Sequence, residues 1–136
     1  DVWDRLVLIF NDTATRLGLK GGFTIPKNYV GTPKIVVVWT ATAITGNVVW
    51  DFDYRAVGGN DTESLDQAGT QESVTVTDAA PTAVNNRLEA SMTLTAANLA
   101  IDDEVEFEVF RDGADAADTM AAAGIVFNIL FEYVDA

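Results

Sequence analysis

The chain consists largely of short segments rich in β-branched and aromatic residues, separated by turn-forming residues. Residues 48–54 and 104–110 alternate between apolar and polar positions, the pattern of a strand with one buried face. Residues 36–39 and 125–131 have the same strand composition. Counting weaker segments, we expect about eight strands and no helix longer than a turn or two. The pattern predicts an all-β fold, an antiparallel β-sandwich that is jelly-roll-like, with an up-and-down barrel as the alternative.

Size and charge narrow the class of protein. At 136 residues, the chain is expected to form a single β-sandwich domain over residues 1–136. It has no apolar run of about 18 residues, so no membrane span is expected. Eight basic and twenty-one acidic residues give a net charge of -13, which disfavours nucleic acid and anionic membranes as partners. The chain starts at Asp1 without a secretory signal, so we expect processing or a missing initial segment.

Turn signals predict how neighbouring segments connect. Thr45, Gly46 and Asn47 separate two strong segments, so residues 35–42 and 47–57 are expected to form an antiparallel hairpin. In the second segment, alternation places one row of side chains in the core: Val48, Trp50, Phe52, Tyr54 and Ala56.

The remaining segments are weaker. Residues 6–10 form a continuous apolar run, typical of a strand covered on both sides or lying in an interface. Gly21 and Gly22 are expected to interrupt the backbone, residues 26–31 to form a loop, and residues 58–69 the longest loop. Residues 72–77 and 87–95 predict half-buried strands, and residues 96–99 a helical turn. Residues 104–111 and 124–134 predict the last two strands.

Catalytic chemistry has few candidates in this composition. Histidine and cysteine are absent, which removes the usual hydrolase triads, Cys-His pairs and zinc sites. Glu104, Glu106 and Glu108 share one strand face and superficially resemble a glycosidase acid pair, but their alternation favours a solvated outer face. We therefore expect no enzyme activity and no catalytic, cofactor-binding or metal-binding residues.

Two further groups have a functional and a structural interpretation. The acidic segment from Asp112 to Asp118 could offer oxygen ligands to calcium, but it lacks EF-hand spacing, and a hydrophilic turn is favoured. The aromatic residues could form a sugar-stacking platform, although core packing is favoured. These aromatic residues are Trp3, Tyr29, Trp39, Trp50 and Tyr54. Glycosylation sequons begin at Asn11 and Asn60, and both are treated as incidental.

Several motifs together resemble small β-sandwich proteins encoded by tailed bacteriophages. These are IPKNYVG at 25–31, VWTA at 38–41, GNVVWD at 46–51, and VEFEVFRD at 105–112 followed by Asp118 and Thr119. The resemblance spans most of the chain from Phe23 onward, and its motifs carry no catalytic content.

The resemblance implies a noncatalytic structural protein of the virion, of the head-decoration or neck and tail-appendage type. It also implies a homo-oligomer, as a trimer of jelly-roll-like units, that docks to other virion proteins. From a different class, the alternative is a carbohydrate-binding β-sandwich module that recognises a host glycan through aromatic residues on loops.

Overall fold

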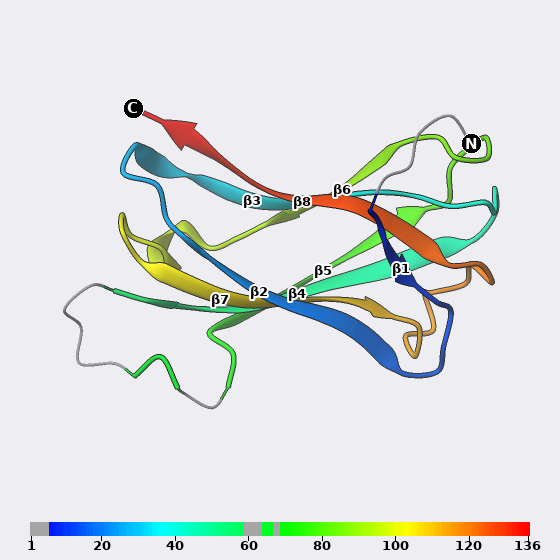
Figure 1. Ribbon diagram of the computed structural model, residues 1–136, viewed down its shortest axis with the longest axis horizontal. Coiled ribbons are helices and arrows are strands. Elements are labelled where there is room, and N and C mark those ends of the chain that lie inside the picture. The colour runs from blue at the N-terminus through cyan, green and yellow to red at the C-terminus, as the bar shows by residue number, and fades with distance from the viewer. Residues whose placement is uncertain (1–5, 59–63, 67–68) are drawn as a thin grey trace.

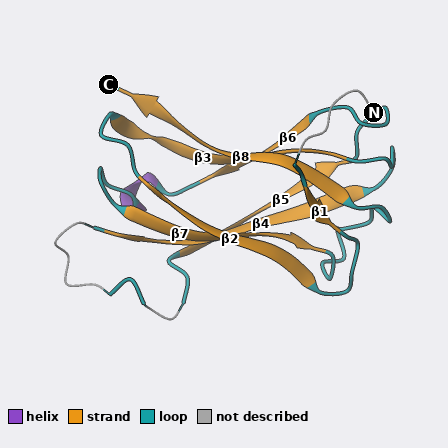
Figure 2. Cartoon of the chain, in the orientation of Figure 1, coloured by secondary structure: helices purple, strands orange, loops and turns teal. Residues whose placement is uncertain are grey.

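A computed structural model describes residues 6–58, 64–66 and 69–136, and its fold is an antiparallel β-sandwich, as predicted. The described residues form eight strands in two four-stranded sheets that face each other (Figure 1). A single turn of 3₁₀ helix, η1, is the one helical element in this part of the chain (Figure 2). The elements are β1 (Leu8–Phe10), β2 (Arg16–Thr24), β3 (Tyr29–Thr40), β4 (Asn47–Val57), β5 (Glu72–Ala79), β6 (Leu88–Thr93), η1 (Ala96–Asn98), β7 (Glu104–Asp112) and β8 (Gly124–Asp135).

The strand order is that of a jelly roll. One sheet has the order β1-β8-β3-β6 and the other β2-β7-β4-β5, and all pairings are antiparallel. The chain changes sheet at most connections, and among consecutive strands only β4 and β5 are paired neighbours. This arrangement of crossing connections is the two-Greek-key pattern of jelly rolls, and the two separate sheets exclude an up-and-down barrel.

The predicted hairpin between residues 35–42 and 47–57 is wrong. The two strands form as β3 and β4, but β3 pairs with β8 and β6, whereas β4 pairs with β5 and β7. Both strands carry apolar side chains that need a facing layer, so the connection crosses the sandwich instead of turning back within one sheet. As a result, Trp39 and Trp50 pack edge to face across the core, with ring centroids 5.6 Å apart.

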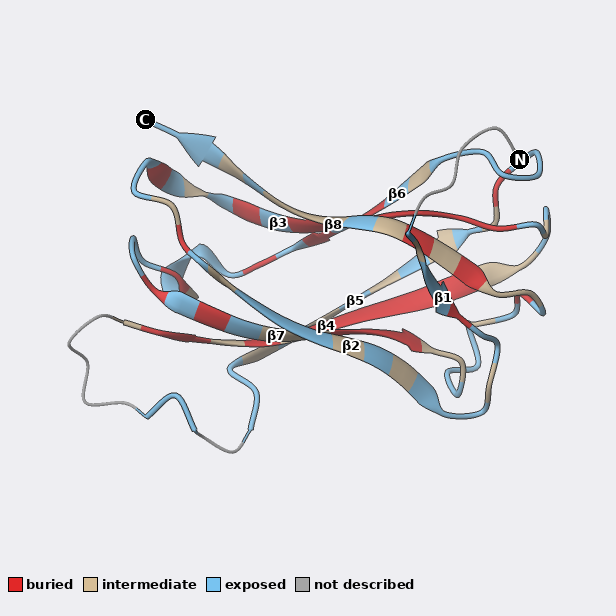
Figure 3. Ribbon diagram, in the orientation of Figure 1, coloured by how far each residue is buried: buried red, intermediate tan, exposed pale blue. Residues whose placement is uncertain are grey.

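The core lies between the sheets and is filled by the inward rows of each strand. The row predicted for β4 is confirmed, since all five of its side chains are buried, and β4 is red along most of its length in Figure 3. The half-buried strand predicted over residues 87–95 is also confirmed, since Ala90 and Met92 of β6 alternate with exposed residues and are buried in the core. Arg111 is an exception to apolar packing, because this charged side chain is fully buried at one end of the sandwich.

Strand β2 continues through the two glycines that were expected to interrupt it. The expected break at Gly21 and Gly22 is wrong, because both lie inside a nine-residue strand paired with β7 along its whole length. A β-carbon at Gly21 would lie 2.7 Å from the ring of Phe107 on the neighbouring strand. The cross-strand ring therefore occupies the space that a side chain would take, which compensates for the weak strand propensity of glycine.

The expectation for residues 6–10 is only partly correct. A strand does form, but β1 has three residues and pairs on one side only, with β8. Phe10 is buried against Trp50, whereas Leu6 is 92% and Ile9 62% exposed. Because β1 is an edge strand, its apolar run is not covered on both sides by the described chain.

The other segments follow the sequence closely. The loop expected at residues 26–31 is shorter, because β3 already begins at Tyr29, and the helical turn at residues 96–99 is confirmed as η1. The strands predicted at residues 72–77 and 87–95 form as β5 and β6, and the last two strands as β7 and β8. Trp3, the sequon at Asn60 and most of the long loop lie outside the described residues.

Gly46 in the β3–β4 crossing provides a test of this topology. Its φ is +90°, and a β-carbon there would lie 2.7 Å from Cα of Met120 in the β7–β8 connection. We expect Gly46→Ala to lower the free energy of unfolding by about 1–3 kcal/mol or more, measured by urea denaturation. Gly31→Ala is the matched control, since no atom lies within 4 Å of its added β-carbon. An equal effect of the two substitutions would contradict the close approach of the crossing to the β7–β8 connection.

Candidate functional site

The outer face of the β2-β7-β4-β5 sheet is charged, as the alternation of β7 predicted. Glu104 and Glu106 are exposed and Glu108 is partly exposed. Acidic side chains of β4 and β7 share this face with Lys20 of β2, which lies 3.7 Å from Glu108. A depression on this face has a volume of about 190 Å³, below the range of about 300–1,000 Å³ for small-ligand pockets. The arrangement is therefore that of a solvated charged surface.

Arg16 neutralises the acidic residues at the other end of this face. Its Nη2 donates to Asp51 at 2.8 Å and lies 3.6 Å from Asp53, and its Nε lies 3.7 Å from Asp112. The guanidinium also stacks 3.9 Å above the centre of the Phe110 ring. The arginine therefore balances the charge of three carboxylates on this face.

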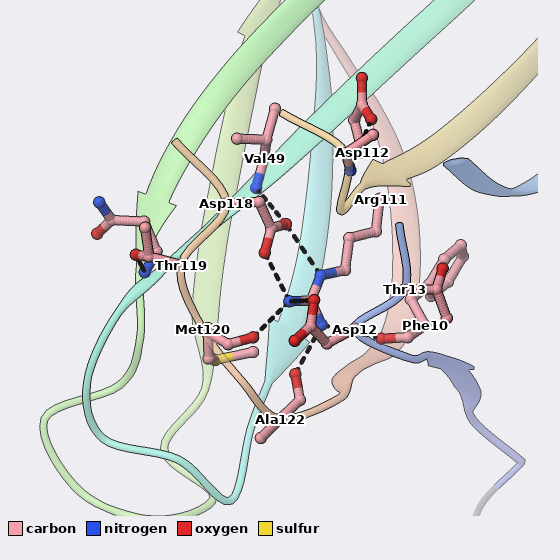
Figure 4. Close-up of polar contacts among 12 residues, drawn as sticks. Phe10, Asp12, Thr13, Val49, Arg111, Asp112, Asp118, Thr119, Met120 and Ala122 are labelled. Atoms are coloured by element: carbon pink, nitrogen blue, oxygen red, sulfur yellow. Dashed lines mark hydrogen bonds and ion pairs between the residues drawn. The ribbon is translucent and has the colours of Figure 1, made fainter. Parts of the chain in front are cut away.

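Arg111 forms the most complete polar cluster of the described residues, at the end of the sandwich where β7 leads into β8 (Figure 4). Its Nε and Nη2 donate to the two carboxylate oxygens of Asp118 at 2.9 and 2.6 Å, and both side chains are fully buried. It also donates to three carbonyl oxygens, those of Phe10 (3.2 Å), Met120 (2.6 Å) and Ala122 (2.6 Å). This bidentate geometry, with its additional acceptors, is what makes a buried ion pair tolerable.

Asp118 extends the cluster to β4. Its Oδ2 accepts a hydrogen bond from the backbone N–H of Val49 at 3.1 Å, and the next residue, Thr119, accepts one from Asn47 at 3.0 Å. Arg111 and Asp118 together therefore connect β1, β4, β7 and the β7–β8 connection. All of the guanidinium nitrogens are used within the protein, so the cluster holds the fold and presents no free group to a ligand.

Hydrogen bonds within the acidic segment from Asp112 to Asp118 are those of a turn. Asp112 and Asp115 accept hydrogen bonds from the backbone N–H groups of Ala114 and Ala117, the local pattern of turn aspartates. Asp118 points inward to Arg111. Within residues 6–58, 64–66 and 69–136, no three acidic side chains converge as a metal site would require. The structure thus favours the turn interpretation.

The aromatic residues weighed as a sugar platform lie in the core. Trp39, Trp50 and Tyr54 are almost completely buried, and Tyr29 is buried as well. Trp39 donates its indole N–H to Asp78 at 2.8 Å. The preference for core packing is confirmed for these four residues.

Tyr54 and Glu72 form a second inward polar group. The hydroxyl of Tyr54 donates to Glu72 at 2.5 Å, and Thr95 donates to the same carboxylate from its backbone N–H and its hydroxyl. Burial by itself would raise the pKa of Glu72, but these hydrogen bonds and one from Asn98 outweigh it and lower the pKa. Burial and the bond to Glu72 raise the pKa of Tyr54. The group ties β4 and β5 to the segment that leads into η1.

The sandwich is incompletely closed along β8. β1 covers this edge only from Gly124 to Val126, and no other strand of the described chain pairs with the rest of the edge. Behind it, an apolar groove of about 390 Å³ opens between the sheets. Its lining includes Phe23, Phe107, Ile129, Phe131 and Tyr133. A neighbouring apolar depression of about 340 Å³ reaches Leu6, Leu8 and Leu19. Sequence reasoning missed this edge, because only the pairing shows which strand stays uncovered.

No protein-family model matches this chain, and a search of curated protein sequences found no significant match. Within the part of the chain that the structure describes, no helix has the length and apolar character needed to cross a bilayer.

The Arg111 cluster makes a sharp prediction for stability. Because removing one partner leaves a buried charge unpaired, we expect Arg111→Met to lower the free energy of unfolding by about 3–5 kcal/mol. Arg87→Met is the control, since its ion pair with Glu89 is exposed and should contribute at most about 1 kcal/mol. In urea denaturation, Arg111→Met combined with Asp118→Leu should destabilise less than the sum of the single changes. Additive losses would contradict a coupled pair.

The hydrogen bond from Tyr54 to Glu72 predicts that the stability of the fold depends on pH. The folded-state pKa of Glu72 is lowered, so its contribution to stability is present above the unfolded pKa and lost as the pH falls through the folded pKa. Tyr54→Phe removes one donor, which should cost about 1–3 kcal/mol at neutral pH and move the folded pKa of Glu72 upward. The variant should then lose less further stability than the wild type between about pH 5 and pH 3, measured by urea unfolding.

Tyr133→Phe is the control for Tyr54→Phe, because Tyr133 donates to Asn28 at the surface. This control should keep the pH dependence of the wild type. An unchanged pH dependence in Tyr54→Phe would instead show that the Tyr54 hydroxyl does not stabilise the ionised Glu72.

Proposed function

We propose that this chain is a noncatalytic structural protein of a bacteriophage virion that self-associates, as a trimer, and docks to other capsid or tail proteins. The proposal is supported by the motif resemblance together with the jelly-roll strand order, an architecture that recurs in viral capsid domains. Fold alone does not specify function, so the proposal also depends on what the surface of the molecule can bind.

The observation that carries it is the edge of β8, most of which no strand of the described chain covers. Strand edges with free backbone groups beside exposed apolar side chains are sites where another chain adds, unless the protein blocks them. Here the edge adjoins two apolar depressions and the exposed side chains of Leu6 and Ile9. A second copy of this chain placed against β1 and β8 would bury these groups. Self-association of this kind, repeated around a symmetry axis, gives a closed oligomer.

The polar groups support a role without catalysis. Arg111 is paired with Asp118, and Tyr54 donates to Glu72, so both pairs are satisfied inside the fold. The carboxylates of the charged face are exposed or paired with Arg16 and Lys20, and none faces a second carboxylate across an enclosed apolar pocket of the described residues. These groups stabilise and solubilise a scaffold.

The oligomeric state tests the proposal. We expect the protein to sediment as a stable trimer at micromolar concentration in analytical ultracentrifugation. Ile9→Asp should shift it toward monomer, because it places a charge on the exposed side of β1 without disturbing the core. Ile44→Asp is the matched control, since Ile44 is similarly exposed but lies in the β3–β4 crossing. A wild-type protein that remains monomeric would contradict self-association.

A further inference from the structure

Two strand edges border the open side of the sandwich, and they belong to different sheets. Among the described strands, β2 pairs only with β7, and β8 is paired on this side only with the three residues of β1. Both strands line the groove behind β8, with Phe23 from β2 and with Phe131 and Tyr133 from β8. A chain that covers this groove can therefore pair with either edge.

The two strands at this opening run in the same direction. β2 starts at Arg16, opposite the end of β7, and β8 starts at Gly124, opposite the end of β1. Arg111, near the end of β7, donates to the carbonyl of Phe10 at the end of β1, so both strands start at the same end of the sandwich (Figure 1). Rotation about an axis along the strands would thus place β8 of one copy beside β2 of the next as parallel neighbours.

On β8, the residues whose backbone faces the free edge are those whose side chains point inward. The N–H of Ile129 donates to the side chain of Asn128 at 2.9 Å, so it does not pair with β3. Backbone groups alternate in direction along an antiparallel pair, so those of Phe131 and Tyr133 also face the free edge. The side chains of Ile129, Phe131 and Tyr133 all pack against the core. An added strand would bond the backbone of these inward residues.

On β2 the relation between backbone and side chain is reversed. Just beyond the strand, the N–H of Ile25 donates to the carbonyl of Asp103 at 2.8 Å, across the pair with β7. By the same alternation, Leu19 and Phe23 bond β7 through their backbone, and the backbone of Lys20 faces the free edge. Leu19 and Phe23 pack against the core, so the edge-facing residues of β2 have outward side chains.

This difference selects a parallel pair between the two edges. Two residues directly opposite each other have side chains on the same face. In a parallel pair, only one of them points its backbone groups at the partner strand, whereas in an antiparallel pair both do or neither does. Parallel pairing of β8 with β2 therefore joins the inner faces of the two sheets, and antiparallel pairing would join an inner face to an outer one. The strand directions and the backbone directions agree.

The charges at the two edges are opposite. The side chain of Lys20 on β2 is 81% exposed, although it lies 3.7 Å from Glu108. Glu132 and Asp135 of β8 are exposed and make no ion pair with the residues that the structure describes. Two β8 edges in contact would bring carboxylates together, and an exposed lysine likewise opposes contact between two β2 edges. Charge thus favours contact between unlike edges, which can close into a ring, over a two-fold dimer.

We propose that residues 128–135 of β8 pair in parallel with β2 of the next copy, so that the open sides of the sandwiches face the axis of a closed ring. The inference rests on the proposed self-association and names the two surfaces that form it. The apolar grooves of neighbouring copies then cover one another at the axis, and the β8 edge is paired along its length.

Cross-linking tests this contact, because the chain has no cysteine of its own. Lys20→Cys is combined in turn with Asn128→Cys, Leu130→Cys and Glu132→Cys, which lie on the outer face of β8. Within one copy, these positions are on the outer faces of different sheets, too far apart for a disulfide, so any bridge joins two copies. After oxidation of the full-length protein with copper phenanthroline, we expect at least one pair to give covalent dimers and trimers on a non-reducing gel.

Lys20→Cys with Glu89→Cys is the matched control, because Glu89 is exposed on the outer face of the same sheet but lies on β6, at the opposite edge. This pair should not cross-link. The inference is overturned if the wild type sediments as a trimer and none of the three pairs cross-links, or if Leu130→Cys alone gives covalent dimers, as a contact between two β8 edges would. A wild type that stays monomeric contradicts the proposed self-association itself, so sedimentation separates the two failures.

Discussion

The packing of Trp50 is the interaction on which the rest of the fold depends. Its ring meets Phe10 of β1 at 5.4 Å and Trp39 of β3 at 5.6 Å between centroids, and a β-carbon at Gly124 would lie 3.0 Å from it. One side chain of β4 thus contacts three strands of the opposite sheet. Arg111 closes the same end of the sandwich through the carbonyl of Phe10 and through Asp118. The apolar packing of Trp50 and the buried Arg111–Asp118 ion pair therefore lie at the same end of the sandwich. Both depend on the position of Phe10 in β1.

Alternation predicted the strands well because it is a local property. The inward rows of β4 and β6 could be assigned from single segments, since side chains on a strand point to opposite faces in turn. Pairing could not be assigned in this way. The residues at 45–47 signal a turn, but a tight turn within one sheet and a crossing between two sheets use the same residue types. Gly21 shows the same limit, because its place in β2 depends on the ring of Phe107, about 86 residues away in the chain, which only the fold brings near.

The candidate sites were harder to predict for a related reason. Arg111 follows an alternating strand and has an acidic segment after it, so sequence alone suggests surface charge, whereas the structure buries both Arg111 and Asp118 as a pair. The sequence around Arg111 does not indicate that its side chain is buried or that Asp118 is its partner. Phe127 and Asn128 are likewise adjacent residues in a segment with clear strand composition, and strict alternation would place them on opposite faces of the sheet. The register shift against β3 is what puts them together.

The two outer faces of the sandwich differ, and this difference bears on function. The β2-β7-β4-β5 sheet carries acidic and basic residues that pair with one another, which suits contact with water. On the other sheet, Leu6 and Ile9 are exposed at or beside β1, and no strand of the described chain covers most of the adjoining edge of β8. Exposed apolar side chains beside an unpaired strand edge favour contact with another protein surface. The proposed subunit contact lies on this side of the molecule, whereas the charged sheet limits nonspecific association.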